Sequence, residues 1–229
     1  MNRSVRLVWL ISILSTVLGS CAAVPEPRLI YQDTLTRVDV RVDRKADRPH
    51  GHPASLTPVQ IGMILAGMRV QTAGMPLYST VVGRPDPLPA FSTSDVIAIS
   101  KPISEALATA KPTELVTFYR RVSDAAVGLA YTTGGIFVEE NLVYIILANH
   151  RVKPMDANIR DVPMYATDPI SNPLLSLGTA RYTLSFERTE AQVKPIKGTW
   201  NYDPSKNYDP YRTIIVDPTL AQRSLATAP

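Results

Sequence analysis

The sequence predicts an α+β fold, with one mostly antiparallel sheet of about five strands and two helices packed on one face of it. Three observations lead to this prediction: an alternating apolar and charged segment, two sharply marked helix starts after it, and short β-like apolar runs from residue 114 onward. A chain of 229 residues is compatible with a single hydrophobic core. We therefore expect one α+β domain, over residues 29–191.

The first expected strand covers residues 29–44. Val38, Val40 and Val42 alternate with charged residues, so the two kinds of side chain lie on opposite faces of a strand. The charged face consists of Arg37, Asp39, Arg41 and Asp43. This pattern is typical of a half-buried strand with a charged outer face, and a polar loop is expected to follow at residues 45–53.

Both helix starts carry a hydroxyl residue at the N-cap and a partner side chain three positions later. Thr57 is followed by Pro58 and Gln60, and Ser92 is followed by Asp95. In each case the two side chains can satisfy each other's backbone N–H groups, which is the capping box that begins many helices.

The two helices are expected to cover residues 58–69 and 93–110. Gly62 and Gly67 weaken the first helix, but they allow another element to approach it closely. Pro102 lies inside the second helix, where it lacks the amide for one helical hydrogen bond, so a kink is expected there.

After residue 114 the pattern predicts strands. Leu142–Leu147 is nearly all apolar, which favours a central strand, and a hairpin is expected to turn at Glu139-Glu140-Asn141, with these charges solvated. The expected strands cover residues 115–122, 136–138, 142–152, 180–188 and, near the end, 213–216. Residues 192–229 are rich in proline and tyrosine and are expected to form a C-terminal arm.

The first 21 residues have the layout of a secretory signal. Arg3 and Arg6 form a basic start, residues 7–17 are mostly apolar, and small residues lead up to Cys21. The apolar run is shorter than the ~20 residues that a membrane-spanning helix needs. Removal of such a signal is therefore expected, although an uncleaved anchor is an alternative.

Leu18-Gly19-Ser20-Cys21 resembles the lipobox of bacterial lipoproteins. The resemblance covers residues 1–21 only, and no family is recognised for residues 22–229. It implies that residues 1–20 are a signal peptide cleaved after Ser20, that Cys21 receives lipid such as palmitate, and that residues 21–28 form a lipidated tether. An ordinary cleaved signal peptide with a chance cysteine is the alternative.

The residues after Cys21 and the overall charge add further expectations. In Gram-negative lipoproteins an Asp after the lipidated Cys favours the inner membrane. Here Ala22 and Ala23 follow, so the resemblance implies anchoring at the periplasmic face of the outer membrane. Cys21 is the only cysteine, so no disulfide can form within the chain. Loss of Arg3 and Arg6 with the signal lowers the formal net charge from +4 to +2, and nucleic acid is not an expected partner.

His50-Gly51-His52 is the strongest candidate for a metal site. Two imidazoles two positions apart can reach one metal ion, with Asp47 nearby. A zinc site needs three or four ligands, however, and His150 is the only other histidine. We therefore expect no metal and no cofactor, and a solvated loop at these two histidines.

Two other features have a simple structural interpretation. Residues 131–135, Tyr-Thr-Thr-Gly-Gly, could expose amides to an anion but match no phosphate-binding motif, so a turn or bulge between strands is expected. Arg120 with Arg121, and His150 with Arg151, could meet anionic lipid, yet charged decoration of strand edges is the simpler expectation.

An aromatic repeat marks the C-terminal segment. Asn-Tyr-Asp-Pro occurs at residues 201–204 and again at 207–210, and Asp-Pro favours turns. Packing on the chain's own sheet, contact with a protein partner and stacking on a glycan all fit this pattern, in decreasing order of expectation. The aromatic residues concerned are Trp200, Tyr202, Tyr208 and Tyr211.

The expected function is that of a non-enzymatic envelope lipoprotein, a structural, assembly or protein-interaction factor that works through the sheet edge or the arm. No serine-hydrolase, zinc-protease or Walker motif occurs in the sequence. The expected partners are the membrane, through lipid on Cys21, and an envelope protein. One alternative is a binding module for lipid, glycan or metal, with an apolar pocket between helices and sheet. The other is a hydrolase in which His52 or His150 lies beside a carboxylate in a cleft.

Overall fold

The alternating segment near the N-terminus forms two strands instead of the single strand expected. In the computed structural model, β1 (Arg28–Gln32) and β2 (Thr36–Val42) pair antiparallel. Asp33 causes the reversal, because its Oδ1 accepts hydrogen bonds from the backbone N–H groups of Leu35 and Thr36, at 2.7 and 2.6 Å. The structure describes residues 25–72, 86–124, 128–153, 168–177, 182–194, 209 and 211–222.

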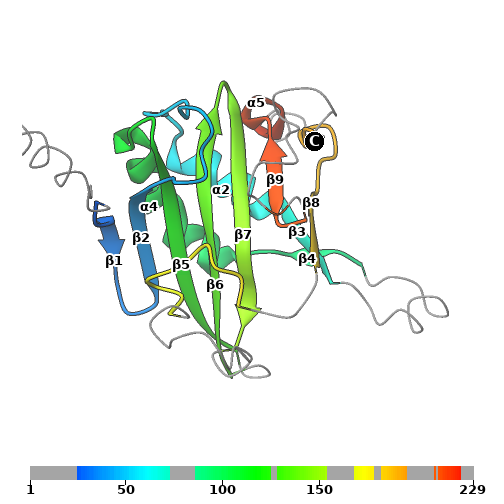
Figure 1. The fold of residues 1–229 in the computed structure, drawn as a ribbon. Coiled ribbons are helices and arrows are strands. Elements are labelled where there is room, and N and C mark those ends of the chain that lie inside the picture. The colour runs from blue at the N-terminus through cyan, green and yellow to red at the C-terminus, as the bar shows by residue number, and fades with distance from the viewer. Residues whose placement is uncertain are drawn as a thin grey trace, which may run out of the picture.

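The main sheet contains six strands, in the order β1-β2-β5-β6-β7-β9, and every neighbouring pair is antiparallel (Figure 1). The fold is therefore α+β, as expected. The central strands are β5 (Glu114–Asp124), β6 (Gly128–Glu139) and β7 (Leu142–Val152). The expected hairpin between β6 and β7 is confirmed. β9 (Thr213–Val216), which lies within the expected arm, pairs with β7 at the sheet edge opposite β1.

A second, smaller sheet was not expected. Its strands are β3 (Met68–Thr72), β4 (Leu88–Pro89) and β8 (Tyr182–Phe186), in the order β4-β3-β8. The expected strand at 180–188 thus exists as β8, but it lies in this sheet and not in the main one. The residue before β3 is Gly67, where a Cβ would lie only 2.5 Å from Phe186 Cζ, so β8 can approach this closely only because position 67 has no side chain.

Both expected helix starts are confirmed. In α2 (Pro58–Gly67), Thr57 Oγ1 accepts from the Gln60 N–H, and Gln60 Oε1 accepts from the Thr57 N–H. Ser92 and Asp95 make the same reciprocal pair at the start of α4 (Thr93–Thr109). A short α5 (Pro218–Gln222) packs against α2. No helix in the described part of the chain is long and apolar enough to cross a membrane.

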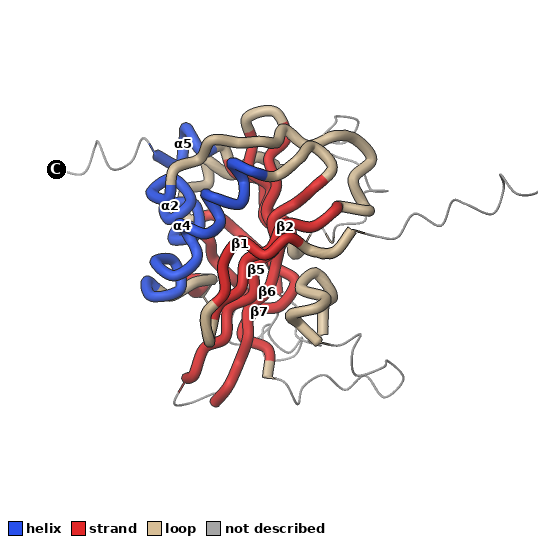
Figure 2. The backbone as a smooth tube through the Cα atoms, turned by 90° about the vertical axis from the view of Figure 1, so that its left-hand side faces the viewer, coloured by secondary structure: helices blue, strands red, loops and turns tan. Residues whose placement is uncertain are grey.

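The main core lies between the helices and one face of the main sheet (Figure 2). Its largest fully buried side chains include Phe118, Ile103, Leu107 and Ile145. Gly134 in β6 sits under this core, where a Cβ would lie 2.7 Å from Phe118 Cζ and 2.0 Å from the Ile146 carbonyl oxygen. Residues 131–135 are therefore part of β6, and not a turn between strands. The pairing of β6 with β7 shifts register at these residues, as it does at a β-bulge.

The opposite face of the main sheet is also covered. The charged outer face expected at residues 37–43 is present, but Asp39 and Asp43 are buried. An apolar cluster on this face of the sheet contains Leu115, Phe137, Tyr144, Ile146 and Ile215. Leu174 packs against this cluster from residues 168–177, which we call the strap. In Figure 1 the strap, drawn in yellow, crosses in front of the sheet, while the helices lie behind it.

Candidate functional site

The residues of the expected lipid site lie outside the described part of the chain. This holds for Ser20 and Cys21, and also for Trp200, Tyr202 and Tyr208 of the aromatic repeat. Tyr211 is described and is 66% exposed, just before β9. Its backbone N–H donates to Asp209 Oδ1 at 2.9 Å, as in a turn at Asp-Pro.

His50 and His52 are buried, which corrects the expectation of a solvated loop. Their exposed fractions are 4% and 5%. His50 Nε2 lies 2.9 Å from Asp43 Oδ2, and Glu139 Oε1 lies 3.6 Å from His50 Nδ1. Arg48 donates to Glu139 Oε2 at 2.8 Å. We call these five residues the loop cluster; four of them belong to the loop after β2, and Glu139 is the last residue of β6.

Glu139 was expected in a solvated turn but is only 5% exposed. The turn begins one residue later, at Glu140, which is exposed and has a φ of 54°. Glu139 is buried because the loop after β2 folds over the end of the sheet. There Gly51 N donates to the Val138 carbonyl at 2.7 Å and His50 N donates to the Pro112 carbonyl at 2.7 Å.

The charges around His50 favour its protonated form. Burial by itself lowers the pKa of the ring, but the hydrogen bond to Asp43 and the charges of Asp43 and Glu139 outweigh burial, so the pKa lies above its ordinary value of 6.5. The ring also packs on Phe137, with the ring centroids 4.3 Å apart. At 3.6 Å the Glu139 contact is an ion pair and not a hydrogen bond.

His52 experiences the opposite effect. Its Nε2 accepts a hydrogen bond from the backbone N–H of Val138 at 3.1 Å, which only an unprotonated nitrogen can do. Burial, and after it the charge of His50, lowers the pKa of His52 to about 4. The two histidines of one short motif therefore have opposite preferences for a proton.

The loop cluster is poorly suited to catalysis or metal binding. Both ring nitrogens of His50 face carboxylates, and the side chain is 1% exposed, so it cannot take a proton from a substrate. Across the described residues, no group of three or more His, Cys, Asp or Glu side chains is arranged to hold a metal ion. The contacts of the loop cluster instead attach the loop after β2 to the end of β6.

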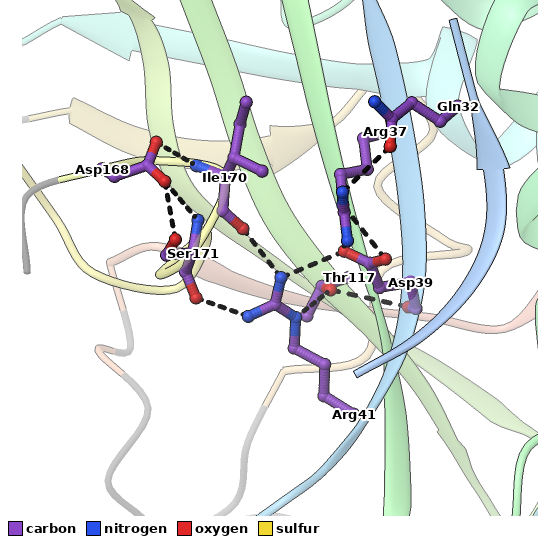
Figure 3. A network of polar contacts seen from close by, with 8 residues as sticks. All are labelled: Gln32, Arg37, Asp39, Arg41, Thr117, Asp168, Ile170 and Ser171. Carbon is purple, nitrogen blue, oxygen red and sulfur yellow. Dashed lines mark hydrogen bonds and ion pairs between the residues drawn. The ribbon is translucent and has the colours of Figure 1, made fainter. Parts of the chain in front are cut away.

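A second buried polar group joins the strap to β2 (Figure 3). Asp39, 2% exposed, accepts hydrogen bonds from Arg37 Nε at 2.8 Å and from Arg41 at 3.0 Å. Arg41 also donates to two strap carbonyls, of Ile170 at 2.7 Å and of Ser171 at 2.5 Å. Its Nε donates to Thr117 Oγ1 at 3.1 Å. We call Arg37, Asp39, Arg41, Thr117 and the strap carbonyls the strap network.

Asn149 holds the other end of the strap. Its side-chain amide donates to the Leu175 carbonyl at 2.7 Å and to Thr133 Oγ1 at 2.8 Å, and its oxygen accepts from Leu177 N at 2.8 Å. Asp168 closes the first turn of the strap by accepting from the backbone of Ile170 at 3.0 Å. Burial raises the pKa of Asp168, but its hydrogen bonds outweigh burial, so the pKa is lowered overall. The strap is thus held near one end by the partly buried Arg41 and near the other by the buried Asn149.

The basic residues expected at strand edges are only partly at the surface. Arg120 is 12% exposed in its side chain and donates to Asp95 Oδ1 and to Thr36 Oγ1, both at 2.8 Å. It therefore joins the start of α4 to the sheet and does not form a patch for anions. His150 is half-buried against Tyr182, and burial, with the charge of Arg151, lowers its pKa to about 4.

Comparison with known proteins adds nothing to this geometry: no family model matches the chain, and no curated protein or solved structure is detectably similar to it. The sequence reasoning missed that Asp39, Asp43 and Glu139 are buried and that Arg41 binds the strap. The only signal near the first strand was the density of charge between positions 37 and 50, which hold five Arg or Lys residues and three Asp.

Proposed function

We propose that the chain is a lipid-anchored protein of the bacterial envelope that acts through protein contacts and not through catalysis. The observation that carries this proposal is the position of β1. Among the described residues the first strand is β1, an edge strand of the main sheet that begins at Arg28, seven residues after the lipobox cysteine, Cys21. An extended tether of this length reaches only about 25 Å, so β1 would be held close to the membrane surface.

The hairpin of β1 and β2, residues 28–42, offers the contact surface that fits this role best. Leu29, Tyr31 and Leu35 are 49%, 38% and 40% exposed, three large apolar side chains within seven residues. Exposed apolar side chains are frequent at protein-interaction sites, and tyrosine is a favoured anchor residue in them. Envelope proteins in the same membrane are the partners that this position favours.

The other edge of the main sheet is less accessible. Beside β9, Gln192 forms an isolated bridge with Val216, and Val193 N donates to the Ile215 carbonyl at 2.9 Å. Among the described residues, no segment pairs with the outer side of β1. The bulge at Ile30 makes added strand pairing unfavourable, so contact through side chains is favoured.

The alternatives have less support. A binding module for lipid or glycan calls for an apolar pocket between helices and sheet, but that space is filled by buried side chains such as Ile99, Ile103 and Phe118. A hydrolase calls for a histidine with an accessible nitrogen beside a carboxylate. The histidine that does contact carboxylates, His50, is enclosed by them.

Lipid anchoring is tested by Cys21→Ser, followed by cell fractionation and labelling with palmitate. We expect the wild-type chain to carry label and to partition with the outer membrane, and the variant to lose both. A wild-type chain that takes up no label would contradict the anchor.

The contact surface is tested by a photo-crosslinking residue at Tyr31 in living cells. We expect a discrete crosslinked product, and we expect less of it with Cys21→Ser. A crosslinker at Leu88, which is 66% exposed in β4, is the matched control and should give no such product. Equal products from both positions would contradict a specific site at the hairpin.

A further inference from the structure

The loop cluster contains two histidines, two positions apart, that make opposite kinds of contact. His50 lies between two carboxylates, whereas His52 accepts a hydrogen bond from a backbone N–H. We propose that His50 is held as the imidazolium cation and His52 as the neutral imidazole, and that together they confine attachment of the loop at residues 43–53 to a window of pH. This inference rests on the loop cluster alone and does not depend on the lipid anchor.

The charges around His50 call for a cation. Asp43 and Glu139 have side chains only 2% and 5% exposed, and both face the ring. Arg48, 36% exposed, forms an ion pair with Glu139. An imidazolium at His50 adds a buried positive charge in contact with both carboxylates, which offsets the cost of burying them.

The contact of His52 calls for a neutral ring. A protonated Nε2 would place its own N–H against the N–H of Val138, so the 3.1 Å hydrogen bond can exist only while Nε2 is unprotonated. A cation at His50 also opposes a second cation at His52, because the two ring centroids are only 5.6 Å apart. The charged state of one histidine therefore supports the neutral state of the other.

The remaining groups around the two rings do not change this assignment. On the β5 side, the charge of Glu114 and nearby backbone groups act on His52, but burial exceeds their effect. On the β7 side, Tyr144 stacks on Phe137, and burial, followed by the charge of Glu139, raises its pKa, so it stays neutral. No other histidine is near, since His150 lies against Tyr182.

The two histidines respond to pH in opposite directions. The pKa of His50 is raised on folding, so its contribution is complete below the unfolded value of 6.5 and is lost as pH rises through the folded pKa. The pKa of His52 is lowered, so its contribution is complete above 6.5 and is lost as pH falls toward about 4. Loop attachment should therefore be strongest near pH 6.5 and weaken on both sides.

The experiment measures hydrogen exchange of the Gly51 and Val138 amides across this pH range, on the full chain in detergent micelles. Rates are expressed as protection factors, which removes the intrinsic pH dependence of exchange. We expect protection to peak near pH 6.5 and to fall by about tenfold per pH unit on each side while one proton is linked to opening. Nitrogen-15 spectra of the unmodified protein at pH 6 should show two protonated ring nitrogens in His50 and one in His52.

Variants separate the fall in protection below pH 6.5, the acid limb, from the fall above it, the alkaline limb. His52→Gln keeps an acceptor for Val138 N–H and should lose only the acid limb. Asp43→Asn removes a carboxylate from His50 and should move the alkaline limb to lower pH. His150→Gln and Asp86→Asn are the matched controls and should keep both limbs. A pH-independent protection factor, equal protonation of His50 and His52, or an acid limb that persists in His52→Gln would overturn the proposal.

Discussion

One buried polar group lies on β2 and the other at the loop that follows it, and they differ in the cation that contacts the buried aspartate. The strap network places the guanidinium of Arg41 beside Asp39 on the outer face of the sheet. The loop cluster places the imidazole of His50 beside Asp43 at the strand end. A guanidinium stays charged at any pH a folded protein meets, whereas the charge of a histidine depends on pH near neutrality.

This difference predicts that the attachment of the strap and the attachment of the loop at residues 43–53 depend differently on pH. Arg41 donates to two strap carbonyls through Nη1 and Nη2, and its Nε donates to Thr117 of the sheet. His50 binds carboxylates at the strand ends, so its hold on the loop depends on its own charge. The strap should therefore stay in place over the whole neutral range, and the loop should not.

The largest expected effect comes from Arg41→Ala. It leaves Asp39 buried with one ion-pair partner fewer and removes the donors for two strap carbonyls. We expect a loss of about 3 kcal/mol in the free energy of unfolding, measured by urea denaturation. Arg44→Ala, at an exposed position nearby, is the control and should cost little. Equal losses for the two variants would remove the special role of Arg41.

A smaller effect is expected from His52→Gln, and only in acid. Because the pKa of His52 is lowered to about 4, the folded state binds fewer protons than the unfolded state between pH 4 and 6.5, and stability falls as pH falls through that range. The variant should lose about 1.4 kcal/mol per pH unit of this dependence. Urea midpoints at several pH values measure it. An unchanged acid slope would show that the loop cluster does not titrate as its contacts require.

The smallest effect is expected from Thr117→Val. The change removes one acceptor for Arg41 Nε but leaves its charge and its contacts with the strap. We expect a loss of about 1 kcal/mol, with no change between pH 6 and 8, because the strap network contains no histidine. Thr183→Val, at an exposed position in β8, is the control. A loss of stability that varied with pH in this range would contradict the difference between the strap network and the loop cluster.

The parts of the fold that the sequence predicted are those set by neighbouring residues. Thr57 with Gln60 and Ser92 with Asp95 mark helix starts because each pair completes its hydrogen bonds within one turn. The β6–β7 hairpin was likewise found, since its turn and its apolar strands are adjacent in the chain. The turn at Asp33 was missed, although an Asp followed by Thr-Leu-Thr is compatible with one.

The candidate site could not be predicted, because its burial depends on residues far apart in the sequence. Asp43 and Glu139 are 96 positions apart, and either one alone reads as a solvated charge. Arg41 meets carbonyls of the strap about 130 positions later. Every residue has a backbone carbonyl, so the sequence near Arg41 does not indicate that the strap would pack over it.

The bulge at Ile30 has a consequence for many copies of the chain side by side. Proteins anchored to one membrane move in two dimensions, and their effective concentration far exceeds that of a dissolved protein. A straight, open edge strand held at this density would invite sheets to join from copy to copy into aggregates. With the proposed lipid anchor, the interrupted β1 at one edge and the residues beside β9 at the other would prevent the sheets of neighbouring copies on the membrane from pairing.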